Sequence, residues 1–143
     1  MPESKERRGW SDREKDKDRD VRRAAVLALY QVNLEAIAAE SAAAAGEGVR
    51  ELIERLSADD EHESVSAANA LAELGPQAAD AVPALALALG RDSKWLREAG
   101  AEALGAVGRQ SRYVVPALEK LLKDKEPEVR TAARKALDRI GGR

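Results

Sequence analysis

The sequence has no cysteine, no phenylalanine and a single histidine, and aromatic residues make up only 3% of its 143 residues. The absence of cysteine excludes disulfides, thiolate catalysis and thiolate metal sites. A single histidine argues against a zinc site built by the protein alone. We therefore expect no metal and no cofactor, and a core of leucine, valine and alanine.

Long apolar runs and a large net charge are also missing. No apolar stretch approaches the roughly 18 residues needed to cross a bilayer, and the charged amino terminus lacks an apolar signal segment. Lys and Arg number 24 against 26 Asp and Glu, so the net charge of −2 gives no long-range attraction for polyanions. We expect a cytoplasmic protein that binds neither membranes nor nucleic acid.

A 33-residue repeat organises the chain. Three apolar positions, one glycine position and one proline position recur at this step. They are Val49, Val82 and Val115; Leu52, Leu85 and Leu118; Leu71, Leu104 and Leu137; Gly75, Gly108 and Gly141; and Pro83 and Pro116. Such a period indicates stacked copies of one unit, in which each copy buries its apolar face only against its neighbours.

Each unit is predicted to be a hairpin of two helices. Apolar or small residues at offsets 0, 3, 4, 7, 8 and 11 form one stripe of a long helix beginning near Val21, Leu96 and Val129. Shorter helices with their own apolar stripes lie between the long ones. The high alanine content favours helix over strand.

Residues with special backbone preferences mark the expected helix ends. The periodic glycines follow the last apolar position of a helix, where a left-handed residue closes the end without steric cost. Pro83, Pro116 and Pro127 fit the first turn of a helix, where the missing N–H is harmless. The turns before the long helices carry aspartates that we expect to act as caps, namely Asp59, Asp92 and Asp124.

Two departures interrupt the repeat. Glu63 stands where the other long helices have Leu96 and Val129, so we expect the first turn of its helix to be shifted or frayed. An alanine-rich insertion lies around 33–48, where the first long helix runs on or restarts as an extra helix. We expect the insertion to cover the apolar first helix. The alternative is that a second copy or a partner covers it, so the protein is a monomer or a homodimer through these segments.

Three segments resemble HEAT repeats, most closely the short variety named after the phycobilisome lyases. They are Asp-Val-Arg-Arg-Ala-Ala at 20–25, Leu-Arg-Glu-Ala-Gly-Ala-Glu-Ala-Leu-Gly at 96–105, and Val-Pro-Ala-Leu-Glu-Lys-Leu-Leu-Lys-Asp with Pro-Glu-Val-Arg within 115–130. The resemblance implies an all-α, right-handed solenoid of about three and a half hairpins over 20–143, after a charged, disordered or frayed tail at 1–19. It also implies that the long helices line a concave face, where relatives commonly bind proteins or peptides.

The solvent side of the long helices supplies the candidate partner-binding residues. They are Trp95, Asn69, Glu98, Glu102, Arg97, Arg130 and Lys135. Leu27, Asn69, Glu102 and Lys135 form one row, polar and of mixed charge, with no obvious packing role. Trp95 stands at an otherwise polar position, so we expect it to be partly exposed. It is either an interface anchor or packed across the turn onto an adjacent unit.

A second row consists of Arg22, Ser64, Arg97 and Arg130. The HEAT resemblance gives these arginines a structural role, in which each pairs with an acidic residue of a neighbouring turn. A guanidinium in the same place could equally receive a carboxylate from a partner. The sequence leaves both interpretations open.

Together these features favour a non-enzymatic scaffold that binds a protein or peptide through its concave face. Glu98 and Glu102 could perform acid–base chemistry only in a desolvating pocket, and we expect a solvated edge instead, with no catalytic residue. Two alternatives stay open. One is an enzyme or enzyme accessory resembling the bilin lyases or another small-molecule-modifying system, and the other is an engineered repeat scaffold.

Overall fold

The computed structural model of the protein describes residues 33–141. The chain divides after Asn33, and the unit that begins at Leu34 is the one described here. The predicted tail at 1–19 and the first long helix, with Arg22 and Trp10, lie outside the described residues.

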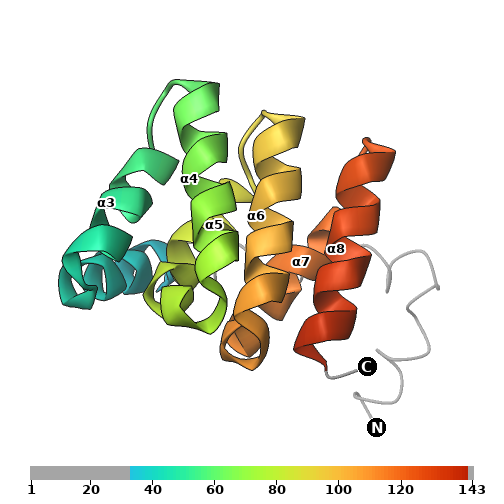
Figure 1. The fold of residues 1–143 in the computed structure, drawn as a ribbon. Coiled ribbons are helices and arrows are strands. Elements are labelled where there is room, and N and C mark those ends of the chain that lie inside the picture. Colours follow the sequence, from blue (N-terminus) through green and yellow to red (C-terminus); the bar gives the residue numbers. More distant parts are fainter. Residues whose placement is uncertain (1–32, 142–143) are drawn as a thin grey trace, which may run out of the picture. The chain divides into compact units, whose positions relative to one another are not determined.

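The described unit consists of helices and turns, without a strand between residues 33 and 141. Residues 33–44 are helical. They are followed by α3 (Glu47–Leu56), α4 (Glu61–Leu74), the 3-10 helix η1 (Gly75–Ala81), α5 (Val82–Ala88), α6 (Lys94–Val107), the 3-10 helix η2 (Gly108–Val114), α7 (Val115–Leu121) and α8 (Pro127–Ile140). The long helices α4, α6 and α8 lie side by side, with α5 and α7 behind them and α3 beside α4 (Figure 1). The predicted all-α solenoid of helical hairpins is confirmed.

The 33-residue step is kept at both ends of the long helices. They begin at Glu61, Lys94 and Pro127, and they end at Leu74, Val107 and Ile140. Pro83 and Pro116 lie in the first turns of α5 and α7, and Pro127 opens α8, as predicted.

The predicted shift or fraying of the first turn of α4 is wrong, because this helix begins in register at Glu61. Glu63 does not have to enter the core. Its side chain remains 44% exposed, and a carboxylate oxygen lies 3.7 Å from Nε of Arg55 on α3. A residue that pairs at the surface leaves the helical backbone undisturbed.

The helices α4 and α6 are capped by residues next to the predicted ones. Asp60, and not Asp59, accepts a hydrogen bond of 3.0 Å from the backbone N–H of His62. Ser93, and not Asp92, accepts one of 3.2 Å from the backbone N–H of Leu96. A side chain reaches the free amides of a first turn only from the extended residue directly before the helix.

The third predicted cap, Asp124, has a different role. The residue before α8 is Glu126, which makes no side-chain capping bond. Asp124 accepts a hydrogen bond of 3.0 Å from the backbone N–H of Glu126. It therefore stabilises the turn before α8 and does not cap the helix itself.

Two of the three periodic glycines end their helices as predicted. Gly75 and Gly108 have φ of 59° and 83°, a region that favours glycine, and the chain then turns into η1 and η2. The prediction is wrong for Gly141, whose φ is −76°. Its N–H still bonds the Leu137 carbonyl at 2.9 Å, so it continues the helical turn of α8.

The insertion is largely helical and is tied to α3. Leu34 and Ala45 are buried. Arg50 of α3 donates from Nε to the carbonyl of Ala42 at 3.2 Å, and from Nη2 to those of Ala43 and Ala45 at 2.8 and 3.2 Å. These bonds satisfy carbonyls in the last turn of the 33–44 helix and directly after it, which have no partner within that helix. Its predicted role as a cover for the first long helix stays a prediction.

The long helices approach one another closely because small residues line their contacts. Ala101, Ala103 and Ala133 are fully buried. At Gly105 of α6, an added Cβ would lie 3.0 Å from Cα and 3.2 Å from Cβ of Ala136 on α8. Larger side chains of the long helices, such as Leu71 and Leu104, are fully buried.

We expect Gly105→Ala to destabilise the protein by about 1 to 3 kcal/mol, because the methyl group overpacks the α6–α8 contact. The loss should exceed the gain of about 1 kcal/mol that alanine brings to a helix interior. Gly48→Ala in α3 is the matched control, since nothing lies within 4 Å of its added Cβ. Urea unfolding followed by circular dichroism should show it to be stabilising. If both substitutions stabilise the protein, the close approach is contradicted.

Candidate functional site

The solvent side of α4, α6 and α8, here named the long-helix face, carries most of the predicted binding residues. Asn69 on α4, Trp95 and Glu102 on α6 and Lys135 on α8 are exposed, and Glu98 on α6 is partly buried. Residues 95, 98 and 102 follow one side of α6, since helical neighbours lie three or four positions apart.

A depression of about 320 Å³ lies between α6 and α8 on the long-helix face. It is lined by Glu98, Glu102, Pro127, Glu128, Thr131, Ala132 and Lys135. The structure thus brings together three of the predicted residues, Glu98, Glu102 and Lys135. Asn69 and Trp95 do not line this depression.

The pKa of the Glu98 carboxyl is raised above its usual range. Burial is the main cause, the carboxylates of Glu102 and Glu128 add to the rise, and Lys94 opposes it. Such a shift occurs in general acids, but it also follows wherever carboxylates crowd one another. Among residues 33–141 no group of three or more histidines and carboxylates could hold a metal ion.

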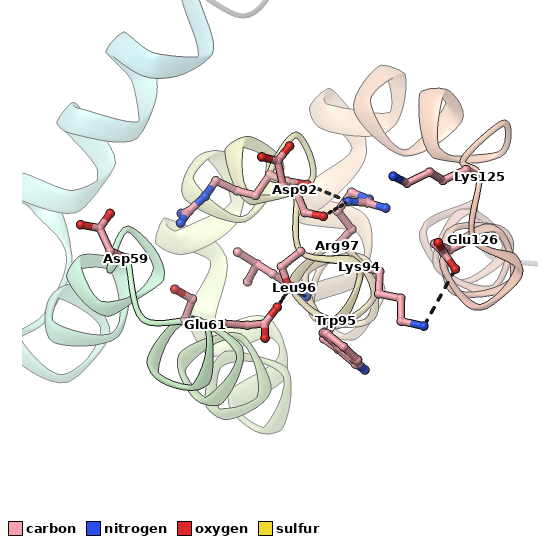
Figure 2. A pocket seen from close by; sticks show the side chains of 12 residues that line it. Asp59, Glu61, Asp92, Lys94, Trp95, Leu96, Arg97, Lys125 and Glu126 are labelled. Atoms are coloured by element: carbon pink, nitrogen blue, oxygen red, sulfur yellow. Dashed lines mark hydrogen bonds and ion pairs between the residues drawn. The ribbon is translucent and has the colours of Figure 1, made fainter.

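Trp95 is partly exposed, as predicted, with 55% of its surface accessible. It projects from the start of α6, and Nζ of Lys94 lies 5.1 Å from the centroid of its ring (Figure 2). The same Nζ lies 3.9 Å from Oε2 of Glu126 before α8. Trp95 also borders a wider cavity of about 610 Å³ along the first turns of the long helices.

Arg97 is buried, with 6% of its surface exposed. Nε and Nη2 donate to the two carboxylate oxygens of Asp124 at 2.9 and 3.1 Å. Nη1 donates to the backbone carbonyls of Arg91 and Asp92 at 2.8 and 2.7 Å (Figure 2). Because both edges of the guanidinium are bound within the protein, Arg97 fits the structural role and not that of a partner-binding residue.

The other described members of this row bond to the equivalent turn. Oγ of Ser64 donates to the carbonyl six residues before it at 2.8 Å, and Nη1 of Arg130 does the same at 2.6 Å. Arg97 likewise donates to the carbonyl six residues before it, that of Arg91. The three carbonyls that accept these bonds belong to Ala58, Arg91 and Asp124, which lie 33 positions apart. The row therefore closes the turn that precedes each long helix, a role that the sequence analysis did not predict.

Sequence reasoning also missed Arg91, which links two hairpins. Its Nη1 and Nη2 donate to the carbonyls of Leu56 and Ala58 in the preceding hairpin, each at 3.2 Å. In the repeat, Arg91 takes the position held by Ala58 and Asp124, so no recurring residue type signals its role. The hydroxyl of Ser93 bonds the Glu61 carboxylate across the same boundary.

The Arg97–Asp124 pair should make stability depend on pH. Burial alone would raise the pKa of Asp124, but the hydrogen bonds from Arg97 and from the Glu126 backbone, with the Arg97 charge, lower it overall. A lowered folded pKa means that the pair stabilises the fold above the unfolded value of about 3.9, and that this stabilisation is lost as the pH falls through the folded value.

We therefore expect Asp124→Asn to lower the free energy of unfolding by about 2 to 4 kcal/mol at pH 7, since it leaves Arg97 buried without its counter-charge. The difference from the unmodified chain should shrink between about pH 4 and pH 2. Urea unfolding across this range measures it, with the exposed Asp138→Asn as control. A difference that stays constant with pH would contradict the assignment.

Residues 114–142 match the family model of the HEAT repeat. A comparison with curated proteins gave no match. The matched range contains α7 and α8, and α5 and α6 repeat this hairpin one 33-residue period earlier. No helix among the described residues is long and apolar enough to cross a membrane. The comparison thus shows a HEAT repeat at residues 114–142, and the hairpin of α5 and α6 repeats its register one period earlier.

Proposed function

We propose that this protein is a non-enzymatic module that binds a protein or peptide segment through the long-helix face, with Trp95 as its anchor. The exposure of Trp95 on α6, one turn before Glu98 of the depression between α6 and α8, is the observation that carries the proposal. Repeat solenoids commonly use such extended faces for binding. We place the protein in the cytoplasm, as its composition suggests.

An exposed tryptophan is a strong anchor because it offers a large apolar surface with only two rotatable bonds. The ammonium of Lys94 at 5.1 Å from the ring favours one placement of the indole. A side chain that is already ordered loses less entropy when a partner binds. Trp95 is therefore suited to contact an apolar side chain of the partner.

The depression supplies the polar part of the proposed site. Glu98 and Glu102 follow Trp95 along α6, and Lys135 faces them from α8. A segment that lies along α6 would meet the indole first and then charged groups of both signs. Such groups fix the register and orientation of a partner more than they add affinity. Asn69 extends the same polar row onto α4.

The proposal can be tested by selecting peptides from a displayed random library and measuring their binding in solution. Replacing Trp10 by phenylalanine leaves Trp95 as the one tryptophan in the chain. Selected peptides should change its fluorescence. Trp95→Ala should weaken binding at least about tenfold, as expected for an interface hot spot.

Leu122→Ala is the matched control, because Leu122 is 38% exposed but follows α7, which lies behind the long helices (Figure 1). It should change the affinity by less than about twofold, as is usual for side chains outside a hot spot. The triple variant Trp95→Ala, Asn69→Ala and Glu102→Ala should lose binding and keep its helical circular dichroism. Failure to select any binder, or equal binding by Trp95→Ala, would refute the proposal.

A further inference from the structure

One edge of the Arg130 guanidinium, at the start of α8, has no partner among the described residues. Nη1 donates to the Asp124 carbonyl at 2.6 Å, which fixes the side chain against its own turn. No residue within 33–141 pairs with the edge formed by Nε and Nη2. Within residues 33–141, the guanidinium of Arg130 is therefore held on one edge and has no partner on the other.

The protein contains a filled copy of this arrangement one period earlier. Arg97 bonds its own turn through Nη1, and its Nε and Nη2 edge holds the Asp124 carboxylate at 2.9 and 3.1 Å. Asp124 lies 27 positions after Arg97, in the turn of the next hairpin. The filled copy shows which ligand the free edge fits, namely a carboxylate presented by a turn.

The side of α8 that carries Arg134 and Asp138 limits which kind of partner can present a carboxylate to Arg130. Ala101 and Gly105 let α6 pack tightly on α8, but the equivalent positions on α8 hold Arg134 and Asp138, both exposed. Two charged side chains prevent another helix from approaching as closely as α8 approaches α6. A second copy stacked as a further hairpin is thus disfavoured, whereas a protruding turn can still reach Arg130.

We propose that Arg130 is a docking point for an aspartate or glutamate carboxylate in an exposed turn of a partner protein. Arg134, one turn further along α8, adds positive charge near Arg130 and favours an acidic segment. Because its geometry is set by the bond to Asp124, the guanidinium of Arg130 needs little reordering on binding. This contact does not involve Trp95 or the depression between α6 and α8.

The test uses the full chain and a capped peptide that copies residues 121–127, with glutamine in place of Glu126 so that Asp124 supplies its one carboxylate. Nitrogen-15 NMR follows the Nε–H signal of Arg130. This signal should shift saturably with the peptide and stay unchanged with a peptide that carries asparagine in place of Asp124. Arg130→Lys should weaken binding about tenfold, because an ammonium cannot form the two-pronged bond.

Arg134→Gln is the matched control and should change the affinity by less than about twofold, as expected for a solvated surface charge. An Arg130 signal that does not move up to about 10 mM peptide, or that moves equally with the asparagine peptide, would overturn the inference. Concentration-dependent self-association that disappears in Arg130→Lys would also overturn it, because a second copy would then supply the carboxylate. Loss of Trp95-dependent binding would leave this result unaffected.

Discussion

The close packing of each long helix against the next is the constraint on which the rest of the structure depends. No hairpin here has a core of its own, so its apolar stripe must be covered by its neighbours. Gly105 against Ala136 shows how near the backbones of α6 and α8 come. Such an approach tolerates only small residues at the contact, which explains why alanine and glycine replace the missing aromatic residues.

This packing brings the turns that precede the long helices next to one another, and the turns then become linked. Arg97 reaches forward to the Asp124 carboxylate. Arg91 reaches back to the carbonyls of Leu56 and Ala58. The boundary between α4 and α6 and the boundary between α6 and α8 are therefore closed by different bonds at the same place. The repeat fixes the position of each link but leaves its chemistry free to vary.

The periodic features of this fold could be predicted from the sequence because they follow from packing, which recurs in every unit. The helical hairpins, the prolines of the first turns and the positive φ of Gly75 and Gly108 belong to this class. Capping was missed by one residue at Asp60 and Ser93, because it depends on which residue of a turn is extended. Gly141 was misassigned because its φ of −76° and its hydrogen bond to the Leu137 carbonyl continue the helical turn of α8.

Only part of the candidate site could be predicted from the sequence, because only some of its features follow from position in the repeat. Exposure of Trp95 could be predicted because the equivalent positions are polar, and Glu98, Glu102 and Lys135 meet because their helices are adjacent. The sequence alone left the arginine row with two interpretations. Position in the repeat did not distinguish Arg97 from Arg130. The difference arises because Asp124 lies within reach of Arg97, while the outer side of α8 is not covered by a further described hairpin.

The functional proposals rest on hairpins that are held in register by bonds passing from one to the next. A double-mutant cycle between Arg97→Met and Asp124→Leu, read by urea unfolding at pH 7, tests this most directly. We predict a coupling free energy of about 2 to 3 kcal/mol, as for partners within one buried network. Destabilisations that add to within about 0.5 kcal/mol would show independent residues and would contradict the account.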